Sequence, residues 1–513
     1  MARATANLEK TLNDAIGLHQ SGDMRAASKL YRRILKRFPQ HADALHLLGV
    51  AQHQLGHNRE AETLIRRAVS VNPDAPAYRY NLTNVLLAAG KPDTALAILE
   101  TLVASDNGNP DFQFNLGLAY AGVERYADAI AAFERTMEVE PLYPGVHLNA
   151  GNAYYRNNDL ERAIDHLQQA IAIDSESYEA HFNLGGALWQ LGRLSAAGPH
   201  LLKAALLKHR PGQQSVPAER LSKAKLKHGI EQLGYLGDLG LLPANGPDIL
   251  ASLQDSLAAF PQLPEGERYA RLPRGTAARL APYLNKILYL HPEERMTGGT
   301  LNPGLDVEQI EHAYLARTPS IVHFDDFLHD ACLARLRQFC LTSTVWFRDT
   351  YAGGYLGAFV EDGFVCPLLL QIAEDLQTTF PRIFGPHRLD RIWAFKYDSD
   401  LKGIEVHADE AAVNLNFWIT PDAANANPNT GGLLLWDQMP PLDWRFDDYN
   451  SDARVADVMD FLADAEVVRV PYRCNRAVVF DSELLHKTDD IDFRAGYENR
   501  RINITMLFGE RQR

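Results

Sequence analysis

The sequence predicts a multidomain protein in which an all-α solenoid of helical repeats precedes a domain built from two antiparallel β-sheets. Three observations predict this fold class. The chain repeats itself about every 34 residues up to residue 210. Beyond residue 318 it carries many short runs in which apolar and polar residues alternate. Its 513 residues also exceed the size of one ordinary domain.

The repeats occupy residues 8–210 and keep a constant register. Alanine returns once per period where the two helices of a hairpin are expected to cross, at Ala27, Ala61, Ala95, Ala129, Ala163 and Ala197. The period resembles that of tetratricopeptide repeats, which are helical hairpins stacked as a right-handed solenoid. Six positions in phase predict six hairpins.

A second series in the repeats places asparagine on the first helix of each hairpin, at Asn13, Asn81, Asn115, Asn149 and Asn183, with Leu47 as the exception. First helices line the concave face of such a solenoid, and an amide can both donate to and accept from a peptide backbone. We therefore expect Asn115, Asn149 and Asn183 to bind a protein or peptide in the groove. The alternative is that asparagine is simply common at this repeat position.

Residues 211–317 are expected to form a helical cap and connector. The repeat breaks at 211–217, and residues 219–233 space their apolar side chains as an amphipathic helix does. Such a helix would cover the apolar end of the solenoid. Further helices are expected near 247–260 and 277–290, and the sequence assigns this region no function.

Residues 318–513 are expected to form the β domain. Short alternating runs separated by turn residues are typical of an antiparallel double-sheet barrel. The runs are 391–397, 413–419, 433–436, 470–480 and 501–508. Helices are expected at 330–341 and 367–379, and the second of them should back the larger sheet.

Two imidazoles and a carboxylate in the β domain point to a metal site. His407 and Asp409 are two residues apart, so an extended chain directs both side chains to the same side. His486 follows the run 470–480 and can supply a third ligand from elsewhere in the sheet. Two histidines and a carboxylate on one face leave coordination positions open, an arrangement typical of non-haem Fe(II).

The order of these elements resembles the Fe(II)/2-oxoglutarate-dependent oxygenases, in particular their prolyl-hydroxylase-like branch. The resemblance covers about residues 318–510. It implies a jelly roll in which His407, Asp409 and His486 hold the iron. It also implies that Arg501 pairs with the far carboxylate of 2-oxoglutarate and that Tyr397 lines the cosubstrate pocket. Neighbouring Arg500 should point to the opposite face of its strand.

This resemblance implies a hydroxylase that uses Fe(II) with 2-oxoglutarate and O₂ as cosubstrates. A solenoid fused to such a domain favours a protein or peptide side chain as the substrate. By strand alternation, Asn414, Asn416 and Trp418 face the barrel mouth and are candidates for contact with substrate or cosubstrate. Two alternatives remain open: an oxygenase of a small molecule whose repeats serve assembly, and a scaffold whose oxygenase domain is inactive.

Composition narrows the function classes further. A net charge of −14 and a pI near 5.7 argue against a general nucleic-acid-binding surface. The four cysteines are scattered, which suits a reducing compartment and predicts neither a zinc site nor a disulfide framework. No apolar run is long enough to span a bilayer and no secretory signal is evident, so we expect a cytoplasmic protein without membrane partners.

Overall fold

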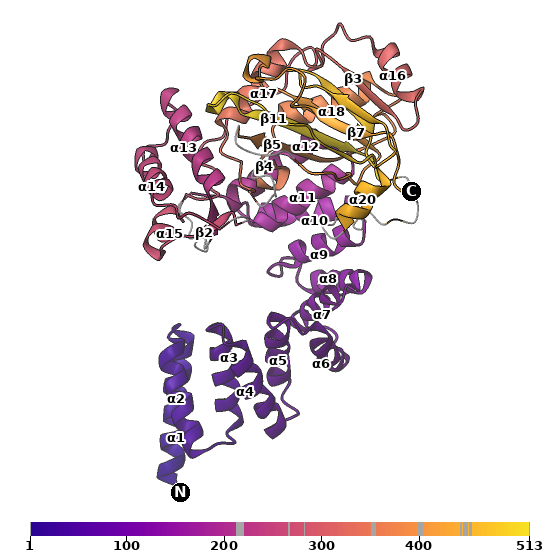
Figure 1. Cartoon of the computed structure of the whole chain (residues 1–513). Coiled ribbons are helices and arrows are strands. Elements are labelled where there is room, and N and C mark those ends of the chain that lie inside the picture. The colour runs from indigo at the N-terminus through magenta and orange to yellow at the C-terminus, as the bar shows by residue number, and fades with distance from the viewer. Residues whose placement is uncertain are drawn as a thin grey trace. The chain divides into compact units, whose positions relative to one another are not determined.

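The computed structural model describes residues 2–211, 220–264, 267–281, 283–349, 355–398, 404–441, 444, 450 and 454–511. The chain divides into two compact units, Met1–Ser175 and Glu176–Arg513 (Figure 1). No helix within the described ranges is both long enough and apolar enough to cross a membrane.

The first unit consists of ten helices that pair into five hairpins. They are α1 (Ala2–Gln20), α2 (Met24–Arg37), α3 (Ala42–Gln54), α4 (Asn58–Val71), α5 (Pro76–Ala88), α6 (Pro92–Ser105), α7 (Pro110–Gly122), α8 (Tyr126–Val139), α9 (Val146–Arg156) and α10 (Leu160–Ile173). Several of these helices begin with a residue that favours a helix N-terminus. Asp23 and Asp159 accept from backbone N–H groups of the first turn, and Pro76 and Pro110 stand where no amide donor is needed.

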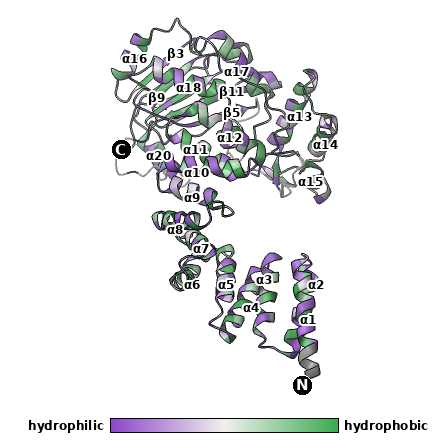
Figure 2. Ribbon diagram, turned by 180° about the vertical axis from the view of Figure 1, so that it is seen from behind, coloured by the Kyte–Doolittle hydropathy of each residue, from purple (hydrophilic) through white to green (hydrophobic). Residues whose placement is uncertain are grey.

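Close packing explains the small residues of the repeat. The predicted alanine series is fully buried, and a Cβ added to Gly117 would lie 2.5 Å from the Phe133 ring of the second helix. Gly151 faces Leu167 in the same way, at 2.7 Å. Figure 2 shows hydrophobic and hydrophilic residues side by side along these helices, as expected of amphipathic helices that bury one face.

The second unit begins with the sixth hairpin, α11 (Tyr178–Gln190) and α12 (Leu194–Lys208). Trp189 Nε1 donates to the Asp390 carbonyl in β5 (Leu389–Tyr397) at 3.0 Å. Ser195 Oγ donates to Glu374 on α18 (Pro367–Thr379) at 2.8 Å. The boundary between the two compact units therefore lies before the sixth hairpin. The sequence predicts that the solenoid ends after this hairpin, at residue 210.

The connector holds β1 (Arg220–Ser222), α13 (Lys223–Asp238), α14 (Gly246–Ala258), β2 (Tyr269–Arg271) and α15 (Arg274–Leu280). Gln232 on α13 donates to the carbonyls of Leu341 and Ser343 at the end of α17 (Asp330–Thr342). α13 thus packs on the β domain. The helix expected over 277–290 is shorter than predicted, because it ends at Leu280 and the backbone of Leu288 and Tyr289 bonds to Thr344 instead.

The β domain contains two antiparallel sheets. One has six strands in the order β3-β9-β6-β11-β5-β4 and the other has three in the order β10-β7-β8. Besides β5, the strands are β3 (Ile321–Phe324), β4 (Leu356–Phe359), β6 (Val413–Trp418), β7 (Leu433–Trp436), β8 (Val467–Val470), β9 (Ala477–Asp481), β10 (His486–Thr488) and β11 (Arg501–Phe508). Trp418 and Phe480 of the larger sheet share an apolar cluster with Leu435 and Val470 of the smaller one. The two sheets therefore pack face to face.

Strand register brings polar side chains together inside this β domain. β11 lies between β5 and β6, with Asn503 opposite Trp418, Thr505 opposite Asn416 and Arg501 opposite Tyr397. Every residue of β11 is buried. The polar members alternate with isoleucine and methionine, so they lie on one face of the strand, between the two sheets. A buried polar face of this kind is expected to be hydrogen-bonded or to bind a ligand.

Candidate metal centre

His407 and His486 are joined through their backbones. The His407 amide donates to the His486 carbonyl at 3.0 Å, and the His486 amide donates back at 2.8 Å. Two residues on, the Asp409 amide donates to the Ser482 carbonyl at 3.1 Å, and Ser482 Oγ donates to the Asp409 carbonyl at 2.9 Å. The segment that carries His407 and Asp409 is thereby fixed beside the segment that carries His486.

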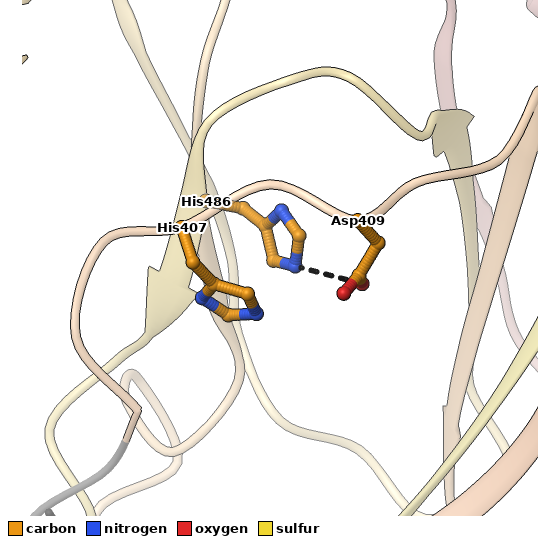
Figure 3. Close-up of side chains that lie close together, drawn as sticks. All are labelled: His407, Asp409 and His486. Atoms are coloured by element: carbon orange, nitrogen blue, oxygen red, sulfur yellow. Dashed lines mark ion pairs between the residues drawn. The ribbon is translucent and has the colours of Figure 1, made fainter. Parts of the chain in front are cut away.

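The three side chains converge on one point (Figure 3). One ligand atom from each lies within 4.8 Å of the others, and His486 Nε2 is 3.6 Å from Asp409 Oδ2. The two imidazole centres are 4.3 Å apart. In the described part of the chain, this is the one group of three or more His, Cys, Asp or Glu residues that meets this spacing.

Backbone carbonyls fix the tautomer of both histidines. His407 Nδ1 is 2.8 Å from the Glu405 carbonyl, and His486 Nδ1 is 2.9 Å from the Leu484 carbonyl. Since a carbonyl only accepts, Nδ1 must carry a proton, and in the neutral form of the ring Nε2 then keeps its lone pair. Burial, assisted by neighbouring His407, lowers the pKa of His486 to about 4, so this imidazole is neutral at pH 7. Both features suit metal ligands.

Asp409 is held by a buried chain of amides. Asn414 Nδ2 donates to Asp409 Oδ2 at 2.7 Å, and Asn416 Nδ2 donates to Asn414 Oδ1 at 2.7 Å. Asn414 is 0% and Asn416 is 4% exposed. The sequence predicts the face on which they lie. Their amides are engaged with each other and with Asp409, and contact with a substrate stays a prediction.

Arg501 lies on the same inner face with part of its guanidinium unpaired. Its Nε donates to the Gly431 carbonyl at 2.6 Å. Its Nη1 and the Nε1 of Trp418 are buried and find no hydrogen-bond partner among the described residues. Burial raises the pKa of the Tyr397 phenol beside it, so this hydroxyl stays protonated. Both donors are buried, and neither meets an acceptor within the described ranges of the chain.

Arg500 points to the opposite face of β11, as alternation predicts. Its Nε lies 2.8 Å from Glu231 on α13, and its Nη2 lies 3.2 Å from Asp398. Arg500 thus joins the strand to the connector and takes no part in the inner face.

The three asparagines predicted to bind a peptide differ in their surroundings. Asn115 is 4% exposed, and its amide donates to Asn84. Asn149 is half-buried and donates to the Gly145 carbonyl of its own helix at 2.9 Å. Asn183 is half-buried on α11, in the second unit. Asn149 and Asn183 remain partly accessible, whereas Asn115 is part of the packing.

Several supporting residues were not anticipated from the sequence. Ser482 binds the backbone of Asp409, and Asn503 and Thr505 continue the amide chain beyond Asn416. Asn503 and Thr505 carry a signal that can be read in retrospect, because they are polar residues alternating with Ile502, Ile504 and Met506 in a buried strand. No comparable sequence signal points to Ser482.

Comparison with known proteins identifies the repeats. Family models described as tetratricopeptide repeat match residues 18–84 and 80–147, and one described as TPR repeat matches 151–192. No curated protein matches the chain.

Three solved structures illustrate the likeness of the repeats. MamA of Desulfovibrio magneticus RS-1 is 22% identical over 33% of this chain and 95% of its own, with a TM-score of 0.31. YrrB, titled a TPR protein with an unusual peptide-binding site, is 23% identical over 33% and 88%, with a TM-score of 0.30. A tetratricopeptide repeat protein from Parabacteroides merdae is 15% identical over 40% and 84%, with a TM-score of 0.35. From the family models we conclude that residues 18–147 and 151–192 are tetratricopeptide repeats.

Proposed function

We propose that the β domain is a jelly-roll Fe(II)- and 2-oxoglutarate-dependent dioxygenase that hydroxylates a side chain of a protein or peptide, and that the repeats recruit this substrate. The observation that carries the proposal is the convergence of His407, Asp409 and His486, with the Nδ1 atom of each imidazole bonded to a backbone carbonyl.

The donor set fits Fe(II). Two neutral imidazoles and one carboxylate are the ligands of the facial triad in non-haem iron oxygenases, and they leave positions for a chelating cosubstrate and O₂. The same ligand types also hold catalytic zinc in some hydrolases. The inner face near Arg501 favours iron, because its buried donors offer an anion-binding site within the same β domain.

The surroundings of Arg501 fit the far carboxylate of 2-oxoglutarate. Arg501 Nη1 and Trp418 Nε1 are donors that need an acceptor, and a carboxylate can accept from both. Thr488 is placed two residues from His486 on β10, roughly 7 Å along the strand on the same side. Thr488 and Arg501 both lie beside the Tyr397 hydroxyl and oppose the rise in its pKa. The proposal places a five-carbon diacid between the histidines and Arg501.

In this proposal the chain's own residues bind and orient. When bound, Fe(II) with 2-oxoglutarate and O₂ supplies the oxidising power for hydroxylation, and 2-oxoglutarate leaves as succinate and CO₂. His407, Asp409 and His486 hold the metal, and Arg501 with Tyr397 fixes the orientation of the cosubstrate. Tyr397, beside Arg501, belongs to a buried apolar cluster with Tyr355 and Phe395, which would limit the access of water to the guanidinium.

Recruitment of a polypeptide is supported by the repeats, whose family members commonly bind peptides or proteins. A second candidate, an oxygenase of a small molecule whose repeats serve assembly, is favoured by a different observation. The α11–α12 hairpin is bound to the β domain through Trp189 and Ser195, which is a structural use of a repeat.

The test is succinate formation from 2-oxoglutarate by the full-length protein with Fe(II) under air. Added cellular polypeptide should stimulate succinate formation if the substrate is a protein, and a small-molecule extract should do so if the second candidate is right. Asp409→Ala is the matched control and should form none. Equal succinate formation in both proteins would remove the proposed activity.

A further inference from the structure

Asp409 is the end point of a hydrogen-bond relay with a fixed direction. Asn503 Nδ2 and Thr505 Oγ1 donate to Asn416 Oδ1 at 2.7 and 2.8 Å. Asn416 in turn donates to Asn414, and Asn414 donates to the Asp409 carboxylate, each at 2.7 Å. The relay crosses two neighbouring strands, β11 and β6, and all four of its polar side chains are at most 5% exposed.

The direction of the relay follows from its chemistry. An ionised carboxylate only accepts hydrogen bonds, so the atom of Asn414 that faces Asp409 must be Nδ2. Oδ1 of Asn414 then faces Asn416, which must present its own Nδ2. Oδ1 of Asn416 is left to face Asn503 and Thr505, and both can donate. Each amide therefore has one permitted orientation, in which one N–H of its Nδ2 donates along the relay toward Asp409.

We infer that Asn414 and Asn416 are positioning residues for Asp409: Asn414 holds the carboxylate in its metal-binding orientation, and Asn416 determines which atom of Asn414 faces it. This inference rests on the proposed metal-binding role of Asp409. It assigns a supporting role to two side chains that are buried and hydrogen-bonded to each other and to Asp409. Groups that orient a ligating carboxylate commonly change metal affinity by about 10- to 100-fold when removed.

The relay makes an unusual prediction for position 416, which does not touch the carboxylate. In Asn416→Asp an ionised new side chain only accepts, so it competes with Asp409 for the Nδ2 of Asn414. When Nδ2 turns toward position 416, the Oδ1 of Asn414 faces Asp409, and the two acceptors repel each other. In Asn416→Leu nothing competes for the Asn414 amide, so Nδ2 stays on Asp409. The two substitutions remove the same side chain and should differ in metal binding.

The experiment measures Mn(II) binding to the full-length protein, with free Mn(II) followed by electron paramagnetic resonance. We expect Asn414→Leu and Asn416→Asp to bind Mn(II) about 10- to 100-fold more weakly than the wild type. Asn416→Leu should stay within about threefold, since the donor to Asp409 is retained. Metal-free thermal denaturation shows that each variant is folded. Thr342→Val is the matched control and should bind as the wild type does, because the Thr342 hydroxyl donates to the Gln338 carbonyl within α17 and lies outside the relay.

Two results would overturn the inference. One is equal Mn(II) affinity in folded Asn416→Asp and Asn416→Leu, because Asn416 would then not determine which atom of Asn414 faces Asp409. The other is wild-type affinity in folded Asn414→Leu. Failure of the wild-type protein to bind Mn(II) would instead remove the metal-binding role on which the proposed function depends, so the two failures are distinguishable.

Discussion

Arg501 and Tyr397 lie directly opposite each other on β11 and β5, and the guanidinium carbon of Arg501 is 4.9 Å from the centre of the phenol ring. The same guanidinium is 5.6 Å from the ring of Trp418 on the other neighbouring strand. A cation between two aromatic rings is held in one orientation. Its unpaired Nη1 is thereby presented to the interior as a fixed donor.

Arg501→Ala should weaken 2-oxoglutarate binding by roughly 2 to 5 kcal/mol, because a charge-assisted pair in a buried pocket is lost. Calorimetric titration of the Mn(II)-loaded protein with 2-oxoglutarate measures the affinity for 2-oxoglutarate. Arg500→Ala should leave that affinity unchanged and lower the free energy of unfolding by about 1 to 3 kcal/mol, since Asp398 keeps its ion pair with Lys227 and Glu231 is partly exposed. The reverse pattern would mean that Arg500 binds the cosubstrate.

Trp418→Phe removes the unpaired Nε1–H and keeps most of the ring. We expect 2-oxoglutarate to bind about tenfold more weakly, as for one lost hydrogen bond to a charged group, with little change in the thermal midpoint. Pyruvate, which lacks the far carboxylate, should bind equally to both proteins. Trp346→Phe is the control, because the Nε1 of Trp346 donates to the Cys340 carbonyl. If the ratio of 2-oxoglutarate to pyruvate affinity is unaltered in Trp418→Phe, Nε1 does not face the cosubstrate.

The repeats should lose stability on acidification through His46. Its Nε2 accepts from Asn81 at 2.9 Å, and burial lowers the pKa of His46 from 6.5 to about 4. The folded state thus binds fewer protons than the unfolded state. The contribution is fully present above pH 6.5 and is lost as the pH falls toward 4, by up to about 3 kcal/mol. Urea unfolding should show a smaller change between pH 7.5 and 5 in His46→Gln than in His53→Gln. Identical changes would exclude His46 as the cause.

The accessible asparagines should contribute to recruitment of a polypeptide substrate. Changing Asn149 and Asn183 together to Ala should reduce turnover of the native protein substrate, by about 0.5 to 1.5 kcal/mol of transition-state stabilisation per amide. Uncoupled decarboxylation of 2-oxoglutarate should be unaffected. Asn115→Ala should mainly lower stability, because its buried amide bonds to Asn84. Unchanged turnover in a folded double variant would favour the small-molecule substrate.

The repeats could be predicted because their packing constrains single positions. Gly117 and Gly151 leave no room for a side chain against the second helix, so the constraint is visible in the sequence as a period. The position of His407 and Asp409 could be predicted because alternation along an extended chain is local. The end of α15 could not be predicted, because the backbone amide of Leu288 bonds to Thr344, which is distant in the sequence.

The sequence also could not reveal the partners of Asp409. Asn414 and Asn416 are predicted to face the interior, but which of them touches Asp409 depends on strand register and side-chain conformation. The assignment of α11 and α12 to the second unit could not be predicted from the sequence for a similar reason. It depends on long-range bonds such as that from Trp189 to Asp390, and the repeat period carries no information about them.

The central claim is that His407, Asp409 and His486 bind Fe(II) in a form that also binds 2-oxoglutarate. The most direct measurement is an anaerobic titration of the Fe(II) protein with 2-oxoglutarate, followed by visible absorption. We expect a metal-to-ligand charge-transfer band that saturates at one equivalent of 2-oxoglutarate and is missing in His486→Ala. A wild-type protein that binds Fe(II) and develops no such band would contradict the central claim.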